Sequence, residues 1–189
     1  MATVAIYGGS FDPPHVGHVL AVSYARSVGW ADEVLIVPVF EHAFDKDLTP
    51  FEDRLQLCRF AFGHLSGVEL CEIERELPRP SYTLRTILAL KQQRPNDEFR
   101  LLMGADAFAE MPKWHRSAEL LRLAPPLVLG RVGVLEPGAP PPVLPGISSS
   151  QVRDWLHRRR EPGILDLLER ALPRDVLREL EARQLYEGG

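Results

Sequence analysis

Two histidines, His15 and His18, follow a glycine turn near the start of the chain, and their type and spacing suit phosphate chemistry. Gly8 and Gly9 come directly after an apolar run, where glycine lets the backbone turn sharply and approach a ligand closely. A helix that follows such a turn directs free backbone amides at the ligand, which favours a phosphate group. Because residues three apart share one face of a helix, we expect both imidazoles to converge on that phosphate, with Gly17 leaving room for a bulky ligand.

Residues 9–18 read Gly-Ser-Phe-Asp-Pro-Pro-His-Val-Gly-His, which resembles the G-x-F-x-P-x-H-x-G-H signature of the nucleotidyltransferase superfamily. The resemblance is closest to the bacterial nicotinate-nucleotide adenylyltransferases. One alternative is a dinucleotide-binding glycine turn, which gives no reason for paired histidines, and another is two unrelated surface histidines in a structural loop. The resemblance implies that His15 and His18 are catalytic. It also implies that the loop binds ATP through Gly8, Gly9, Ser10, Phe11, His15, Gly17 and His18.

A second candidate site begins at Ser148, because a serine followed three residues later by Gln151 forms a capping box for a helix. A well-capped helix is one interpretation of this segment. Arg153 adds a cation near the helix N-terminus, which opposes the macrodipole and indicates that an anion also occupies that end. The segment resembles the I-S-S-T-x-x-R motif of the same family, with Ser150 in place of threonine. The resemblance implies that Ser149, Ser150 and Arg153 bind the β and γ phosphates of ATP, with Arg153 among the catalytic residues.

Further stretches resemble the nicotinate-nucleotide branch in particular and concern the acceptor. From the residues alone, Trp114 could equally anchor a loop, and Asp106 could equally cap a helix. The resemblance implies that the Trp114 indole stacks on a pyridine ring and that Asp106 lies near a ribose or other substrate groups. It is carried by Ser-Tyr-Thr at 81–83, Gly-Ala-Asp at 104–106, Trp-His-Arg at 114–116 and Leu-Tyr at 185–186. The implied mononucleotide-binding residues are Thr83, Gly104, Asp106 and Trp114.

One segment departs from the family pattern. The family has a P-P-H-K run after its second strand, whereas residues 39–46 read Val-Phe-Glu-His-Ala-Phe-Asp-Lys. Lys46 is expected to replace the family's lysine at the mononucleotide, and His42 is a candidate for its histidine, but both could equally be solvated loop residues. The altered loop leaves open whether nicotinate or nicotinamide mononucleotide is preferred.

Apolar runs that suit strands alternate along the chain with segments of helical periodicity. This alternation predicts an α/β, three-layer Rossmann-like fold with a parallel sheet of about five strands, helices on both faces and a helical C-terminal cap. We expect a single domain over residues 1–189, with its C-terminal helical part from about residue 147. Expected strands are 4–7, 33–39, 68–73, 99–103 and 127–131. Helices are expected over 16–28, 117–123, 148–159 and 164–171. Three further helix boundaries come from local signals: one helix starts at a capping box at Thr49, one runs from 81–83 to Pro95, and one starts at Pro173. Residues 136–146 are expected to form a surface connection.

Composition limits the partners and the location of the protein. A formal net charge of −4 argues against a general nucleic-acid binder. No apolar run approaches the ~20 residues needed to cross a bilayer, and no basic region precedes the first apolar run, so neither a membrane span nor a signal peptide is expected. Cys58 and Cys71 are expected to be free thiols, which suits the cytoplasm. The sequence leaves the oligomeric state open, including a homo-oligomer.

The resemblance implies an enzyme of NAD biosynthesis that transfers the adenylyl group of ATP to nicotinate mononucleotide and releases pyrophosphate. The acceptor phosphate is already ionised, so catalysis rests on positioning and charge stabilisation rather than on a general base. His18, supported by His15, is expected to donate hydrogen bonds to the α-phosphate. Mg²⁺ is expected to be bound mainly by the ATP phosphates, and no metal ligand is assigned. Alternatives are a nicotinamide-mononucleotide or phosphopantetheine-type adenylyltransferase and a catalytically silent nucleotide-binding module.

Overall fold

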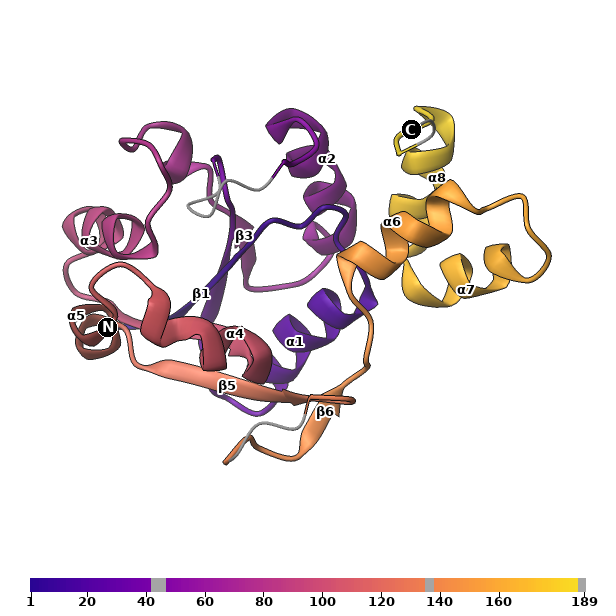
Figure 1. The fold of residues 1–189 in the computed structure, drawn as a ribbon. Coiled ribbons are helices and arrows are strands. Elements are labelled where there is room, and N and C mark those ends of the chain that lie inside the picture. The colour runs from indigo at the N-terminus through magenta and orange to yellow at the C-terminus, as the bar shows by residue number, and fades with distance from the viewer. Residues whose placement is uncertain (42–46, 135–137, 187–189) are drawn as a thin grey trace.

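The computed structural model describes residues 1–41, 47–134 and 138–186, which form a six-stranded sheet with helices on both faces (Figure 1). The strands are parallel and lie in the order β3-β2-β1-β4-β5-β6, so the direction of winding reverses between β1 and β4. This is the strand order of a Rossmann-like, doubly wound sheet, and the predicted fold is confirmed. The strands are β1 (Thr3–Gly9), β2 (Glu33–Pro38), β3 (Val68–Leu70), β4 (Glu98–Gly104), β5 (Pro126–Arg131) and β6 (Pro142–Leu144).

The sheet has one strand more than the sequence predicts. β6 lies within the stretch that was expected to be a surface connection, and it pairs with the end of β5 at an edge of the sheet. It is three residues long, starts at a proline and exposes two of its three side chains. A strand this short has no alternation that could reveal it, and proline is tolerated here because an edge strand needs few ladder hydrogen bonds.

The helices divide between the two faces of the sheet. Side chains of a strand alternate between faces, so Ala5 packs with the core of α1, α2 and the C-terminal helices, whereas Val4 and Ile6 pack with the core of α3 and α5. Figure 1 shows α6, α7 and α8 gathered beside α1 and α2, away from α3 and α5. The helices are α1 (Val16–Ser27), α2 (Phe51–Phe62), α3 (Thr83–Gln93), α4 (Ala105–Glu110), α5 (Ser117–Leu123), α6 (Ser149–His157), α7 (Ile164–Ala171) and α8 (Arg174–Ala182), with 3₁₀ turns η1 (Ile73–Arg75) and η2 (Met111–Lys113).

Two local predictions are wrong. The capping box expected at Thr49 is absent, because Pro50 is the N-cap of α2 and Glu52 pairs with Arg75 at 2.6 Å instead of reaching back to the cap. The strand expected over 68–73 ends at Leu70, since the chain turns into η1 at Ile73 and buries that side chain. α4 was not predicted, because its six residues carry too few turns to show a helical period.

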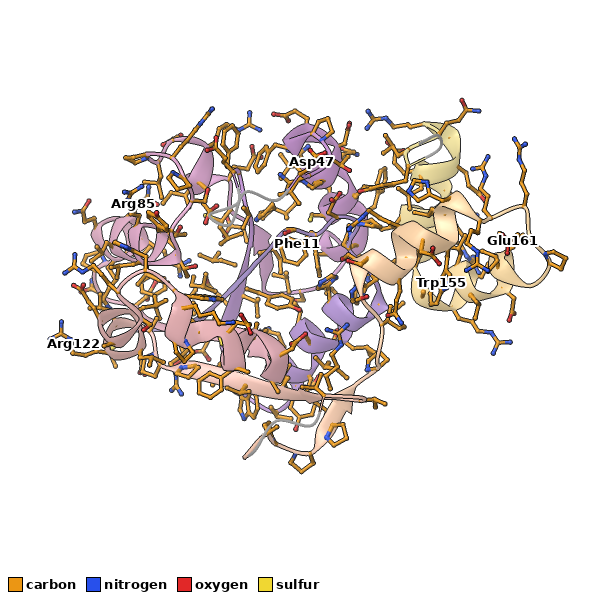
Figure 2. The ribbon with its side chains drawn as sticks, in the orientation of Figure 1. Phe11, Asp47, Arg85, Arg122, Trp155 and Glu161 are labelled. Carbon is orange, nitrogen blue, oxygen red and sulfur yellow. The ribbon has the colours of Figure 1, made fainter. Side chains whose placement is uncertain are left out.

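The reversal of strand order places the site. In an open parallel sheet, the carboxyl ends of the strands on either side of such a reversal border a crevice that binds ligands. Here those ends are Gly9 of β1 and Gly104 of β4. Figure 2 shows Phe11, two residues after β1, near the centre of the molecule, whereas Arg85, Arg122 and Glu161 lie at its periphery. No helix in the described part of the chain has the length and apolar character to span a membrane.

Candidate active site

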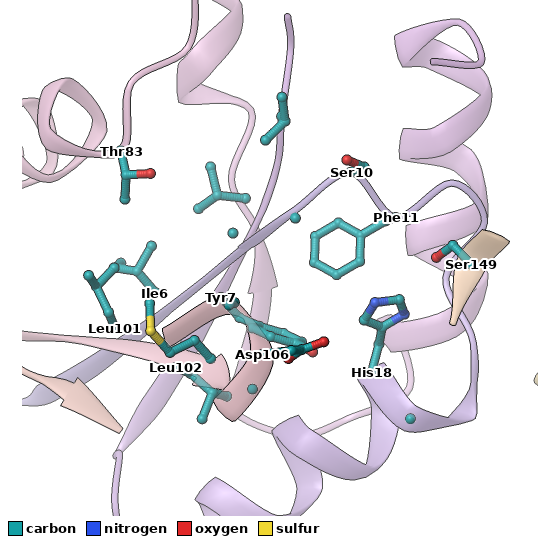
Figure 3. A pocket seen from close by; sticks show the side chains of 18 of the residues that line it. Ile6, Tyr7, Ser10, Phe11, His18, Thr83, Leu101, Leu102, Asp106 and Ser149 are labelled. Carbon is teal, nitrogen blue, oxygen red and sulfur yellow. The ribbon is translucent and has the colours of Figure 1, made fainter. Parts of the chain in front are cut away.

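A cavity of about 690 Å³ opens at the carboxyl ends of β1 and β4 and extends to the N-terminus of α6 (Figure 3). Figure 3 shows His18, Phe11 and Ser149 at one end of the cavity and Thr83 at the other. Arg153 is not among the lining residues, and Lys46 and His42 lie outside the described residues. The predicted site residues that line the cavity are Gly8, Gly9, Ser10, Phe11, His15, Gly17, His18, Thr83, Gly104, Asp106, Trp114, Ser149 and Ser150.

The two histidines form the capping box of α1. His15 is the N-cap residue, and its Nδ1 accepts a hydrogen bond from the Gly17 amide at 3.1 Å. His18 Nδ1 accepts from the His15 amide, also at 3.1 Å, and the two rings stack with centroids 3.8 Å apart. Because each Nδ1 accepts, this hydrogen-bond pattern assigns the proton of each neutral ring to Nε2. Each imidazole therefore has an N–H group left to donate.

Both imidazoles are neutral at neutral pH. Burial, together with the smaller effect of the nearby Arg131 guanidinium, lowers the pKa of His15 to about 4. The pKa of His18 is well below its usual value, first through burial and then through the charges of His15 and Arg131. The pair consequently offers hydrogen-bond donors without placing two adjacent cations beside the cavity.

The free protein is expected to lose stability as the pH falls from 6.5 towards 4. In that window the unfolded chain binds a proton at His15, whereas the folded chain does not until about pH 4, so protonation favours unfolding. His15 alone contributes about 3 kcal/mol to this loss, since one pKa unit corresponds to about 1.4 kcal/mol. Thermal unfolding of the ligand-free protein, followed across this pH range, measures the effect.

The matched variant for this measurement is His15→Asn, because asparagine keeps an N-cap acceptor but does not titrate. Its melting temperature should fall less steeply with decreasing pH than that of the unchanged protein. Two parallel curves would contradict the assignment of a lowered pKa to His15.

The Phe11 side chain packs against the His18 ring. Its ring lies edge-on to His18, with centroids 5.1 Å apart, and edge-on to Tyr7 at 5.6 Å. Its backbone is left-handed, with φ of 48°, which a bulky residue adopts only where surrounding packing enforces it. The Phe11 ring also fills the space that a Cβ on Gly9 would need, at 3.2 Å. A side chain at position 9 would therefore press on the Phe11 ring, and the same ring holds His18 through its edge-on contact.

The N-terminus of α6 is joined to the loop that precedes α1. The predicted capping box is confirmed: Gln151 donates from its amide to Ser148 Oγ at 3.2 Å, and its side chain accepts from the Ser148 amide at 2.9 Å. The Ser149 hydroxyl donates to the Pro13 carbonyl at 2.9 Å. This contact brings two predicted phosphate sites, the glycine turn and the α6 N-terminus, to the same cavity.

Arg153 reinforces that junction. Its Nη1 donates to the Asp12 carbonyl at 2.6 Å, and its Nη2 donates to Ser150 Oγ at 3.3 Å. The Asp12 carboxylate lies 3.7 Å from the guanidinium and is nearly fully buried. The other oxygen of that carboxylate accepts from the Tyr186 hydroxyl at 2.6 Å. In the sequence, Tyr186 stands out only as part of the Leu-Tyr ending, and nothing in the local pattern around Asp12 indicates this link.

Besides Arg153, the site has a second cation, Arg131, which lines the cavity and to which the sequence patterns give no role. It ends β5 and pairs with Asp106 at 2.7 Å, and its Nη2 donates to the Ile147 carbonyl just before α6. Asp106 does not cap α4, whose N-cap is Gly104. Gly104 cannot be replaced without a shift, because a Cβ there would collide with the Asp106 carboxylate. Arg131 thus connects the predicted acceptor side with the segment that leads to the α6 serines.

The side of the cavity that is predicted to bind the acceptor carries aromatic and hydroxyl groups. Trp114 and Thr83 line it, and Tyr82 stacks on His115 with ring centroids 4.5 Å apart. Behind them, the buried Glu74 carboxylate accepts from the Thr86 hydroxyl at 2.9 Å and from the Phe40 amide at 3.1 Å. This network ties η1, α3 and the end of the β2 segment together.

The carboxylates at the cavity are already engaged by protein groups. Asp106 pairs with Arg131, and Glu74 accepts from Thr86. Within the described ranges, no group of three or more His, Cys, Asp or Glu side chains lies close enough together to hold a metal ion.

A Rossmann-like sheet with a neutral histidine pair and a capped helix N-terminus at its switch point defines the class of nucleotidyltransferases. The cytidylyltransferase-like family model matches residues 6–154. A probable nicotinate-nucleotide adenylyltransferase of Anaeromyxobacter sp. (strain K) is 42% identical over 98% of this chain and 97% of the relative. The nicotinate-nucleotide adenylyltransferase of Bacillus subtilis (strain 168) is 31% identical over 99% of this chain and 100% of the relative. The chain belongs to the family of nicotinate-nucleotide adenylyltransferases.

A solved structure supports the fold. The nicotinic acid mononucleotide adenylyltransferase of Plasmodium falciparum, complexed with NaAD, has a TM-score of 0.84 and covers 98% of each chain. Its sequence identity is 20%, so the likeness concerns the arrangement of the elements.

Proposed function

We propose that the protein transfers the adenylyl group of ATP to nicotinate mononucleotide, giving nicotinate adenine dinucleotide and pyrophosphate in NAD biosynthesis. The observation that carries the proposal is one cavity that joins the His15–His18 pair to the α6 serines and to Trp114, in a chain of this family. A phosphate oxygen of the mononucleotide forms a bond to the α-phosphorus. The bond from that phosphorus to the β-phosphate bridge oxygen breaks, and pyrophosphate leaves.

The histidines stabilise the charge that develops in this step. The Nε2–H group of His18, with that of His15 beside it, donates to the α-phosphate oxygens as the transferring group changes bonds. Neutral rings are sufficient because the nucleophile is an ionised phosphate and no proton has to be removed. The rings are fixed before substrate arrives, so they need no reorganisation during the reaction.

The outer phosphates of ATP are assigned to the N-terminus of α6. Ser149, Ser150 and Arg153 stand at that end, where the helix dipole and free amides favour anions. Magnesium enters as part of the MgATP substrate, which suits a cavity whose carboxylates are already engaged.

The acceptor is assigned to the opposite end of the cavity. Thr83, Gly104, Asp106 and Trp114 surround it, with the indole stacking on the pyridine ring. Lys46 stays a prediction from the sequence, as do a cytoplasmic location and the lack of a nucleic-acid partner.

Pyrophosphate release with MgATP and one acceptor at a time tests the function. The acceptors are nicotinate mononucleotide, nicotinamide mononucleotide and phosphopantetheine, with a sample lacking acceptor as the control. We expect turnover with nicotinate mononucleotide, and the dinucleotide product is identified by chromatography. Turnover with nicotinamide mononucleotide alone would reassign the acceptor. Absence of turnover with all three would overturn the enzyme assignment in favour of a nucleotide-binding module.

Replacement of Trp114 by alanine is expected to raise the KM for the mononucleotide by roughly 5–150-fold, because ring stacking contributes about 1–3 kcal/mol. The KM for ATP should change less than about twofold, since the indole lies at the acceptor end. Steady-state kinetics with each substrate varied in turn measure both values. Trp114→Phe keeps an aromatic face and should recover most of the loss, whereas equal increases in both KM values would place the pyridine elsewhere.

A further inference from the structure

Arg54, in the first turn of α2, is 1% exposed and is among the largest fully buried side chains of the protein. Buried arginines are usually paired with a carboxylate, since an isolated charge is costly to remove from water. The Arg54 guanidinium instead donates to three backbone carbonyls: Nε to Thr49, Nη1 to Ser10 and Nη2 to Val39, each at 2.8 Å. Among the described residues, no carboxylate lies within ion-pair distance of it.

Two of the three carbonyls, those of Ser10 and Val39, belong to residues that line the cavity, whereas Thr49 does not line it. Ser10 lies in the turn between Gly9 and the histidine pair, which is the ATP side. Val39 follows β2 and lines the cavity on the neighbouring strand, and Thr49 precedes α2. Ser10 and Val39 follow adjacent parallel strands, β1 and β2, and the Val39 amide also donates to the Gly9 carbonyl at 2.9 Å.

The neighbouring residue on the second wall is also held. The Phe40 amide donates to the buried Glu74 carboxylate at 3.1 Å, and Glu74 in turn accepts from Thr86 of α3. Residues 39 and 40 are therefore fixed from both sides by buried charged groups. The guanidinium contacts both this segment and the turn that carries the histidines, in addition to the hydrogen bond from the Val39 amide to the Gly9 carbonyl.

We infer that Arg54 is a positioning residue for adenylyl transfer, holding the Ser10 turn and its histidines at a fixed distance from the Val39 wall. The inference rests on the proposed function. A guanidinium is a rigid planar fork that can reach three diverging carbonyls, whereas a lysine ammonium is a single point of charge. A displacement of about 1 Å between reacting groups can cost ~10²-fold in rate, even when substrates still bind.

The test compares Arg54→Lys and Arg54→Gln with the unchanged protein. We expect kcat for pyrophosphate release to fall ~10²-fold in Arg54→Lys, while the Kd for MgATP measured by calorimetry changes less than about threefold. Arg54→Gln keeps hydrogen-bond donors on a shorter side chain. For this variant too, we expect kcat to fall while the Kd for MgATP changes less than about threefold. Circular dichroism and the melting temperature establish that each variant is folded at the assay temperature.

Leu57→Ala is the matched structural control. Leu57 lies on the same helix, is fully buried in the core and does not line the cavity. Its truncation should lower the melting temperature while leaving kcat unchanged well below that temperature.

Three results would overturn the inference. They are a kcat within about threefold of the unchanged protein in folded Arg54→Lys, an equal loss of kcat in Leu57→Ala, or failure of both Arg54 variants to fold, which would assign the residue to the fold alone. Failure of the proposed function is distinct, because it would appear as absent turnover in the unchanged protein.

Discussion

Replacing His18 by alanine is expected to lower kcat by ~10²-fold or more while the Kd for MgATP changes only a few-fold. The Nε2–H group of His18 is oriented before substrate binds, because Nδ1 is occupied by the His15 amide and the ring is packed against Phe11. A donor held in this way stabilises the transferring phosphoryl group more than it stabilises bound ATP. Single-turnover kinetics and calorimetry with MgATP separate the two quantities.

The control for this substitution is His18→Gln, because the glutamine side chain can accept from the His15 amide and preserve the capping box of α1. If the large loss in His18→Ala arises from the missing donor rather than from the helix start, His18→Gln, whose amide NH₂ can still donate, should keep the melting temperature and recover part of the activity. An unchanged kcat in His18→Ala would remove this residue from the proposed mechanism.

Replacing Arg153 by alanine is expected to lower kcat/KM for ATP by ~10²-fold. The guanidinium is the only described side chain of α6 that bonds to the Asp12 carbonyl, and it also reaches Ser150. Its removal deletes a cation from the assigned outer-phosphate site and releases one end of the loop that precedes the histidines. Because both effects act on the donor substrate, KM for ATP should rise more than KM for the mononucleotide.

Arg158→Ala is the comparison for Arg153. Arg158 follows the last turn of the same helix and pairs with Asp154 and Glu161 in solvent, so its loss should leave kinetics within about twofold. Arg153→Lys keeps the charge but not the planar guanidinium that can donate in two directions. Its kcat/KM for ATP should therefore lie between the values of Arg153→Ala and Arg158→Ala. If Arg153→Ala and Arg158→Ala behaved alike, the outer phosphates would have to bind elsewhere.

The sequence predicts the scaffold and the approximate site because both depend on local patterns. Buried strands such as β2 are continuous apolar runs, and the spacing of His15 and His18 suffices to bring their rings together. The sequence does not show that each histidine Nδ1 accepts a hydrogen bond from a backbone amide, because that depends on the φ and ψ angles of the N-cap.

The features that the sequence does not predict are long-range contacts of charged residues. Arg54 precedes most of the apolar residues of α2 in sequence and looks like an ordinary polar residue of the first turn, yet it is buried against carbonyls that lie up to 44 residues away. Arg131 ends a strand, and only the packing of Asp106 and Ile147 around it gives it partners. Such partners are fixed by the folded chain and leave no periodic signal.

The contacts that join α6 and Tyr186 to the first loop have a consequence for the order of folding. Ser149 and Pro13 are separated by 136 positions, Arg153 and Asp12 by 141, and Tyr186 and Asp12 by 174. Contacts between such distant segments require large loops to close and therefore form slowly compared with local structure. An intermediate with its strands and helices already formed, but with the C-terminal helices undocked, would lack the phosphate site. Catalytic competence is therefore expected only once these long-range contacts have formed.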